Sequence, residues 1–167
     1  MKAMKNKTVV YLIKDKDSAA LKRAATHDYF GEAEISYLEN GKPIIKSPEG
    51  YHISVSHSGT LTALVISDLP IGIDIERVRE FDFSRLKERF LSEKEREAVL
   101  SKEDFFKIWV KKEAEAKIEG GGVFAMREKD ATATFSSISE ELSSFAGEAY
   151  EGTIASFSKI DYTVRKL

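Results

Sequence analysis

Short runs of β-branched and aromatic residues recur along the chain, several of them alternating apolar and polar positions, and both patterns are typical of β-strands. The run at 61–67 (LTALVIS) is almost continuously apolar, which favours a central strand. Asn40-Gly41 predicts a tight turn between two neighbouring runs. The predicted strands are 8–13, 35–38, 43–45, 53–57, 61–67, 71–76, 132–135, 152–157 and 162–165.

Helical spacing of apolar residues appears between these runs, together with residues that begin and end helices. A helix is predicted at 17–31, with Asp17 or Ser18 as its cap and Gly31 as its stop. A short helix is expected at 83–90. Ser92 and Glu95 form a capping box that begins another. The longest helix is predicted at 104–119 and ends at three glycines. These elements predict an α+β fold.

The arrangement of elements suggests two halves. Each half contains helices followed by strands, and the segment 77–90 is the expected joint. We therefore expect an N-terminal half at 1–80 and a C-terminal half at 81–167.

The longest predicted helix carries two charges on its apolar stripe. The i, i+3, i+4 spacing that begins at Phe106 and Trp109 continues through Val110 to Glu113 and Lys117. One interpretation is a surface ion pair, because Glu at i and Lys at i+4 is a favourable order. The other is that the stripe leads into a cleft, where both charges face a ligand.

The segment IGIDIE, residues 71–76, places Gly72, Asp74 and Glu76 on one face of a strand. Two carboxylates at this spacing have Cα atoms about 7 Å apart, so their oxygens can converge on one cation. The alternative is a polar strand face in water. Gly72 weakens that alternative, because glycine inside a strand often marks a close approach by a ligand or by backbone.

Two further segments offer polar groups. In SVSHSG, residues 54–59, Ser56 and His57 stand at a strand end and could hold phosphate oxygens, although a lone histidine is more often a turn residue without a partner. In GKP, residues 41–43, Lys42 follows the tight turn and precedes Pro43.

Composition narrows the classes of protein. A chain of 167 residues with 42% hydrophobic and 32% charged residues is typical of a soluble globular protein. The absence of cysteine excludes thiolate nucleophiles and zinc–thiolate sites. A net charge of −2 argues against nucleic-acid binding, and no apolar run approaches the ~20 residues of a membrane span. The N-terminal MKAMKNKTVVYLIKDK is expected to lead into a first strand and not to be a signal peptide, so the expected compartment is the cytoplasm.

The order of these motifs is more specific than any one of them. GKP, ISVSHSG, IGIDIE, RFLSEKE and WVKKEAEAKIEGGG follow one another between about residues 35 and 123. This succession resembles the 4′-phosphopantetheinyl transferases of the surfactin-synthetase-activator type. The family patterns are a strand with Gly, Asp and Glu, and a helix of the form Trp-x-x-Lys-Glu-Ala/Ser-x-x-Lys followed by glycines.

The resemblance implies an enzyme that moves the phosphopantetheine arm of coenzyme A onto a serine of an apo carrier protein, with Mg²⁺ as cofactor and 3′,5′-ADP as by-product. It also implies a role for each matching residue. The expected Mg²⁺ ligands are Asp74, Glu76 and Glu113. The expected catalytic pair is Glu113 and Lys117, of which Lys117 would also contact the pyrophosphate. Coenzyme A would be bound further by His57 and Ser56 at its phosphates, by Lys42 and Pro43 near the adenine, and by Arg23 at the 3′-phosphate.

The resemblance also sets expectations for assembly and partners. We expect a monomer whose halves are related by a pseudo-two-fold axis, with the active site between them. The basic segment 77–89 is expected to steer an acidic carrier protein, or else to be a solvated joint. The competing functions are an inactive module that binds coenzyme A or a carrier, and a Mg²⁺-dependent enzyme that cleaves phosphodiesters with water.

Overall fold

The structure is a computed structural model that describes residues 8–167. Residues 1–7, the start of the expected N-terminal half, lie outside the described residues. The strands are β1 (Thr8–Ile13), β2 (Glu34–Tyr37), β3 (Pro43–Ser47), β4 (His52–Ser58), β5 (Leu61–Ser67), β6 (Ile71–Arg77), β7 (Thr134–Ser137), β8 (Tyr150–Ser156) and β9 (Tyr162–Lys166). The helices are α1 (Ser18–Phe30), α2 (Ser84–Phe90), α3 (Glu93–Ala98), α4 (Lys102–Glu119), α5 (Ser139–Ala146) and the 3₁₀ turn η1 (Val123–Met126).

The predicted strands and helices are confirmed with small shifts at their ends, and the fold class is α+β. Asp17 caps α1 through its side chain, and Ser92 and Glu95 form both bonds of a capping box. Gly120 ends α4 in the left-handed conformation that favours glycine. Helix α5 and the turn η1 were not predicted.

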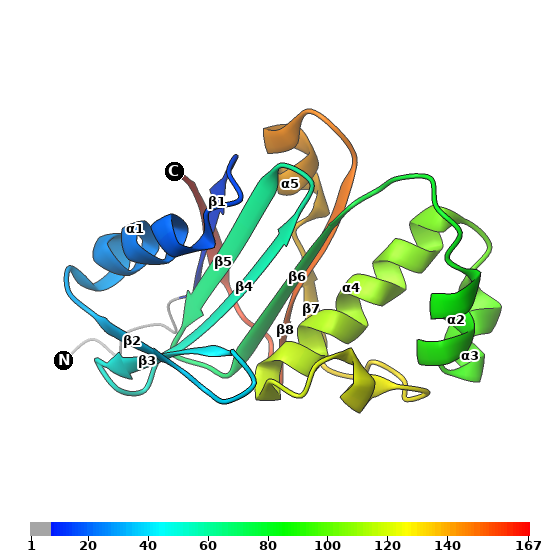
Figure 1. The fold of residues 1–167 in the computed structure, drawn as a ribbon, viewed down its shortest axis with the longest axis horizontal. Helices are drawn as coiled ribbons and strands as arrows, with labels where there is room; N and C mark the ends of the chain where they lie inside the picture. Colours follow the sequence, from blue (N-terminus) through cyan, green and yellow to red (C-terminus); the bar gives the residue numbers. More distant parts are fainter. Residues whose placement is uncertain (1–7) are drawn as a thin grey trace.

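Two sheets dominate the molecule, with a helix on the outer side of each (Figure 1). The first has the order β4-β5-β1-β9, and the second has the order β6-β8-β7. Helix α1 packs against the first sheet, and α4 crosses β6 and β8 of the second. The hairpin β2-β3 forms a separate two-stranded sheet.

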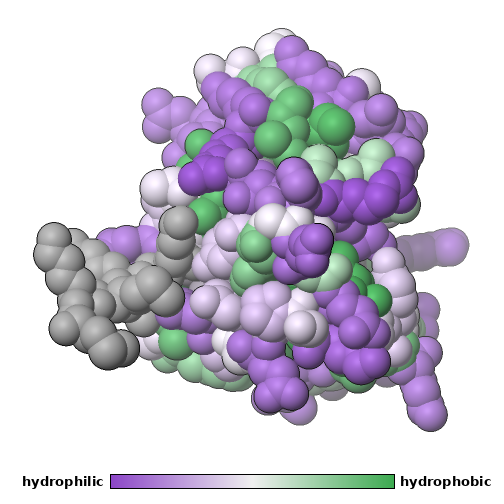
Figure 2. Space-filling view, turned by 90° about the vertical axis from the view of Figure 1, so that its left-hand side faces the viewer, coloured by the Kyte–Doolittle hydropathy of each residue, from purple (hydrophilic) through white to green (hydrophobic). Residues whose placement is uncertain are grey.

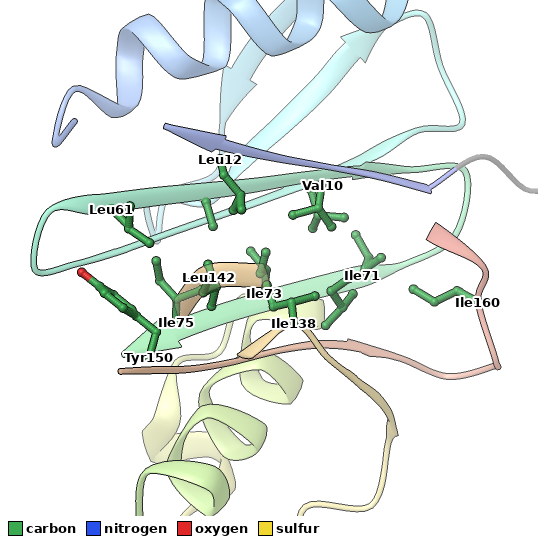
Figure 3. Packing of buried hydrophobic residues seen from close by; sticks show 13 residues of the cluster. Val10, Leu12, Leu61, Ile71, Ile73, Ile75, Ile138, Leu142, Tyr150 and Ile160 are labelled. Atoms are coloured by element: carbon green, nitrogen blue, oxygen red, sulfur yellow. The ribbon is translucent and has the colours of Figure 1, made fainter. Parts of the chain in front are cut away.

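The main hydrophobic core lies between the two large sheets. Side chains of β1 and β5 point toward those of β6, as Val10 and Leu12 opposite Ile71 and Ile73 illustrate (Figure 3). Leu142 of α5 joins the same cluster. A second cluster lies under α1, and an aromatic cluster packs α2 against the first turns of α4. The sheets are therefore fixed relative to each other by burial of apolar side chains, the main force that stabilises folded proteins.

The face that carries α1 is mixed in polarity, with hydrophobic areas separated by hydrophilic side chains (Figure 2). Within residues 8–167, no helix combines the length and the apolar character needed to cross a membrane.

The sheets cross the expected boundary at residue 80. Strand β6, from the first half, pairs with β8, whereas β9, from the second half, pairs in parallel with β1. Each half thus supplies one strand to the sheet of the other.

Candidate active site

Strand β6 and helix α4 meet at a backbone contact that only glycine permits. A Cβ atom on Gly72 would lie 1.9 Å from the carbonyl oxygen of Ala114. The close approach expected from this glycine is therefore made by the backbone of α4. Alternation along β6 turns its isoleucines into the core and leaves Asp74 and Glu76 on the side of α4, next to the turn that carries Glu113.

Asp74 is almost completely buried, with 5% of its surface exposed. Its Oδ1 accepts hydrogen bonds from Ser56 Oγ at 3.0 Å and from Lys117 Nζ at 2.8 Å. Its Oδ2 is buried without a hydrogen-bond partner among the described residues. Burial raises the pKa of Asp74, and the charge of Lys117 opposes that rise. A buried carboxylate oxygen without a donor is costly, so a cation is the ligand that this position favours.

Glu113 is half-buried, and its pKa is raised to about 7. Burial is the largest cause, the negative charge of Asp74 adds to it, and Lys117 opposes it. Lys117 forms its ion pair with Asp74, not with Glu113 one turn earlier on α4. The surface ion pair considered for this helix is thus replaced by a contact between α4 and β6, and the stripe does lead inward.

Glu76 completes the set of carboxylates. Its Oε2 accepts a hydrogen bond from Ser58 Oγ at 2.9 Å and lies 3.4 Å from Arg79. Within residues 8–167, no three His, Asp or Glu side chains converge closely enough to surround one metal ion. Carboxylate oxygens are the ligands that Mg²⁺ prefers, and the Oδ2 of Asp74 has no other partner, so the chemistry of this site suits Mg²⁺. The ammonium group of Lys117 takes the position of a cation at the other oxygen, Oδ1.

A cavity of about 260 Å³ is lined by Lys117, the ion-pair partner of Asp74, but not by the three carboxylates themselves. It brings together Lys42, Pro43 and Lys117, to which the family resemblance assigns the binding of coenzyme A. Its other lining residues are Asn40, Gly41, Ser54, Val55, Gly120 and Gly122.

The β2-β3 hairpin forms one wall of this cavity because it is attached to the C-terminal end of α4. Asn40 Nδ2 donates to the carbonyl oxygen of Gly120 at 2.5 Å, and Lys42 Nζ donates to that of Ile118. A lysine at a helix C-terminus also interacts favourably with the helix dipole. Burial lowers the pKa of Lys42, which indicates a partly desolvated ammonium group beside the cavity.

The remaining predicted site residues lie in different surroundings. Ser56 is buried and already contacts Asp74. His57 is exposed at the end of β4, and Arg23 is exposed on α1. Among residues 8–167, no described side-chain bond or cavity connects His57 or Arg23 with the carboxylates, so their roles stay predictions.

The sequence interpretation missed a fully buried lysine in the same helix. Lys112 Nζ donates to Glu95 Oε2 at 2.8 Å and to the carbonyl oxygen of Lys129. The other oxygen of Glu95 accepts the backbone N–H of Ala131. Lys112 therefore ties α4 to the capping box of α3 and to the segment after η1. The Trp-x-x-Lys-Glu pattern contains a lysine at this position, and that is the signal that could have identified it.

A larger cavity, of about 330 Å³, lies between α4 and strands β7 and β8. None of the predicted site residues lines it. The chemistry of the carboxylates and Lys117 therefore places the candidate active site at the smaller cavity.

Comparison with known proteins gives one consistent result. The sequence model of the 4′-phosphopantetheinyl transferase superfamily matches residues 70–158, a range that includes β6, α4 and β8. The proposed ligands Asp74, Glu76 and Glu113 all fall within it, as does Lys117.

Curated proteins match a similar part of the chain. It is 37% identical over 90 residues to the 4′-phosphopantetheinyl transferase psf-1 of Bacillus pumilus, covering 50% of this chain and 38% of that protein. It is 34% identical over 98 residues to the 4′-phosphopantetheinyl transferase Sfp of Bacillus subtilis strain 168, covering 55% and 43%. It is 36% identical over 109 residues to AcpT of Salmonella typhi, covering 59% and 56%. The matched part of the chain thus spans between 38% and 56% of these relatives.

Proposed function

The chain belongs to the 4′-phosphopantetheinyl transferase superfamily, and on this basis we propose that it transfers the phosphopantetheine arm of coenzyme A to a serine of an apo carrier protein and releases 3′,5′-ADP. The observation that carries the proposal is the meeting of β6 and α4, where Asp74 has an unpartnered buried oxygen beside Lys117 and Glu113. The names of the relatives support the same activity.

Coenzyme A would occupy the cavity beside the hairpin. Lys42 and Pro43 would contact the adenine end, and Lys117, which lines the same cavity, would contact the pyrophosphate. Ser56 and His57 would contribute to phosphate binding, and Arg23 would bind the 3′-phosphate. The lysines support this placement, because a partly buried ammonium group attracts phosphate oxygens more strongly than one in water does.

Glu113 is the proposed base that accepts the proton of the carrier serine. In the metal-free protein its pKa is about 7, so it exchanges a proton near neutral pH, and a bound cation would favour its ionised, proton-accepting form. Lys117 is the proposed contact of the leaving phosphate, to which it would turn from Asp74 when the substrate enters. The serine oxygen then forms a bond to the phosphorus of the arm, and 3′,5′-ADP departs with the electrons of the broken P–O bond.

Asp74, Glu76 and Glu113 are the proposed ligands of Mg²⁺. When bound, the ion would neutralise the pyrophosphate and help to align the attack. The unpartnered Oδ2 of Asp74 supports this assignment. Binding requires Lys117 to release Oδ1, and the substrate phosphates offer Lys117 another partner.

The carrier protein would dock beside α2. Arg85 and Arg89 are exposed on this helix, and the guanidinium of Arg89 lies 5.2 Å from the ring centre of Phe124, which is 62% exposed. Cationic side chains next to an exposed aromatic ring suit an acidic partner with an apolar centre.

We also propose that residues 1–80 and 81–167 form two halves related by a pseudo-two-fold axis, within a cytoplasmic monomer. The reciprocal exchange of β6 and β9 between the sheets supports this arrangement. The proposed site lies where the two halves meet, because Lys117 of the second half forms its ion pair with Asp74 and also reaches the carbonyl oxygen of Val55, both in the first half.

Mass spectrometry tests the activity directly. Several apo carrier proteins are incubated with the enzyme, coenzyme A and Mg²⁺, and at least one should gain the mass of phosphopantetheine. A parallel reaction with coenzyme A or nucleic acid but no carrier tests for phosphodiester cleavage by water. Coenzyme A binding without a mass change on any carrier would instead favour the inactive binding module.

A further inference from the structure

Three serines of β4, at alternate positions, line the edge of β6. Ser54 Oγ accepts the backbone N–H of Ile73 at 3.1 Å, and Ser56 Oγ accepts that of Ile75 at 3.1 Å. Ser58 Oγ accepts the N–H of Arg77 at 3.0 Å. Because β4 and β6 belong to different sheets, these hydroxyl groups replace the carbonyl groups that a neighbouring strand would offer.

Two of these serines also orient carboxylates. Ser56 Oγ donates to Asp74, and Ser58 Oγ donates to Glu76 Oε2 at 2.9 Å. In both places the hydroxyl accepts the N–H that follows the acidic residue and donates its own proton to that residue's carboxylate. A serine hydroxyl has one donor, so this arrangement fixes its rotation and fixes the carboxylate with it.

Ser54 has the first role without the second. The residue of β6 that precedes its N–H partner is Gly72, which has no side chain to receive a proton. Its hydroxyl therefore joins the two strands but orients no carboxylate. This difference offers a control within the same row of serines.

We propose that Ser58 is a positioning residue for the divalent cation site and acts by holding Glu76 toward Asp74. The inference rests on the proposed function, from which it takes the cation as Mg²⁺. Arg79 shares this carboxylate with Ser58, because its guanidinium lies 3.4 Å from the same Oε2. Without the hydroxyl, Glu76 turns toward Arg79 and away from the cation.

The backbone of Ser58 does not depend on its side chain. Tyr150 Oη donates to the carbonyl oxygen of Ser58 at 2.9 Å and accepts the N–H of Thr60 at 3.1 Å. These two bonds remain in a Ser58→Ala variant, which loses the bond of the hydroxyl to Glu76 and its bond from the N–H of Arg77.

Binding of Mn²⁺ alone, measured from the electron paramagnetic resonance signal of the free ion, tests the proposal without turnover. Groups that orient metal ligands typically contribute 10–100-fold to affinity, so Ser58→Ala should weaken Mn²⁺ binding by about tenfold or more. Ser54→Ala should stay within about twofold of the wild type, and Ser58→Thr, which keeps a hydroxyl, should bind as the wild type does. Arg79→Ala in the Ser58→Ala background should restore part of the lost affinity.

Equal losses in Ser54→Ala and Ser58→Ala would overturn the proposal, because the serines would then act only by joining the strands. Normal Mn²⁺ binding by Ser58→Ala would overturn it as well. Thermal unfolding of each variant without metal identifies any variant that has failed to fold, and Ser58→Thr then decides the result. If the wild type transfers phosphopantetheine and Ser58→Ala binds metal normally, only this inference is overturned. If the wild type neither binds Mn²⁺ nor modifies a carrier, the proposed function is overturned too.

Discussion

Lys117 and Asp74 illustrate what sequence spacing reveals about single residues. Helical periodicity places Lys117 one turn after Glu113 and shows that the two share a face of the helix. Periodicity can indicate partners only within the same helix. The ion pair with Asp74 joins residues 43 positions apart, and no local pattern specifies it. The types of residue in the site could therefore be predicted from the sequence, whereas their pairing required the packing of α4 on β6.

Glu113 should make the stability of the metal-free protein depend on pH. Its pKa rises from 4.5 to about 7 on folding, so the folded state binds more protons between these values. The resulting stabilisation is complete below pH 4.5 and is lost as the pH rises through 7. Relative to the wild type, Glu113→Gln should therefore gain on the order of 1 kcal/mol between pH 5 and pH 8, after allowance for solvent screening.

Urea unfolding of both proteins at the two pH values, with a metal chelator present, measures this difference. An offset that does not change with pH would contradict the raised pKa. With metal and substrates present, Glu113→Gln should transfer phosphopantetheine ~10²–10⁴ times more slowly, as expected when an acid–base group is removed. Near-normal transfer to an apo carrier would remove Glu113 from the mechanism.

Lys112 should be important for stability, although it is not proposed to touch a substrate. Replacing Lys112 with methionine removes the cation of a buried ion pair and leaves the carboxylate of Glu95 without its partner. Such a loss typically lowers the stability by about 3–5 kcal/mol. Lys111→Met is the matched control. Lys111 precedes Lys112 in the chain but its side chain is exposed, so this substitution should change stability by less than about 1 kcal/mol. Chemical denaturation of the two variants checks the prediction, and equal effects would contradict it.

At the scale of elements, the contact between the hairpin and the end of α4 depends on Gly120. Its φ of +82° disfavours other residues, and a Cβ atom there would lie 2.7 Å from Asn40 Nδ2. Gly120→Ala should lose about 1–2 kcal/mol of stability and detach the hairpin, which would weaken coenzyme A binding. Hydrogen exchange of residues 38–43 should therefore become faster.

Gly122→Ala separates backbone strain from this contact. Gly122 also has a positive φ, +68°, but a Cβ atom there would meet no other atom within 4 Å. We expect a similar loss of stability without faster exchange in the hairpin. If both variants release the hairpin equally, strain at the glycine run explains the effect and the contact with Asn40 does not.

The elements with marked ends could be predicted, and α5 could not. Asn40-Gly41, the Ser92–Glu95 capping box and Gly120 each impose a backbone geometry by local chemistry. Helix α5 follows Ile138 without a side-chain cap, and its sequence is rich in serine. It is stabilised by burial of Leu142 in the core between the sheets, a tertiary contact that periodicity over eight residues does not reveal.

At the scale of the whole molecule, charge is distributed unevenly even though the net charge is only −2. The segment 77–89 contains five basic residues, Arg77, Arg79, Arg85, Lys87 and Arg89, against three acidic residues, Glu80, Asp82 and Glu88. Arg79 is committed to Glu76 and to the rings of Phe81 and Phe106, whereas Arg85 and Arg89 are exposed. The exposed pair on α2 is therefore the part of this segment that can meet a partner.

Reversal of these two charges should affect the carrier protein and leave coenzyme A unaffected. The Arg85→Glu/Arg89→Glu variant should raise the KM for an acidic carrier by about tenfold at low salt, because steering by surface charge acts mainly on association. The difference from the wild type should shrink as ionic strength rises, since exposed charges are screened beyond about 10 Å at 0.1 M salt. Lys159→Glu, an exposed site in the β8–β9 connection, changes the net charge by half as much per molecule and serves as the control for a general charge effect. Steady-state kinetics with each substrate varied in turn separates the possibilities: an unchanged carrier KM, or an equal rise in the control, would assign 77–89 to a solvated joint between the halves.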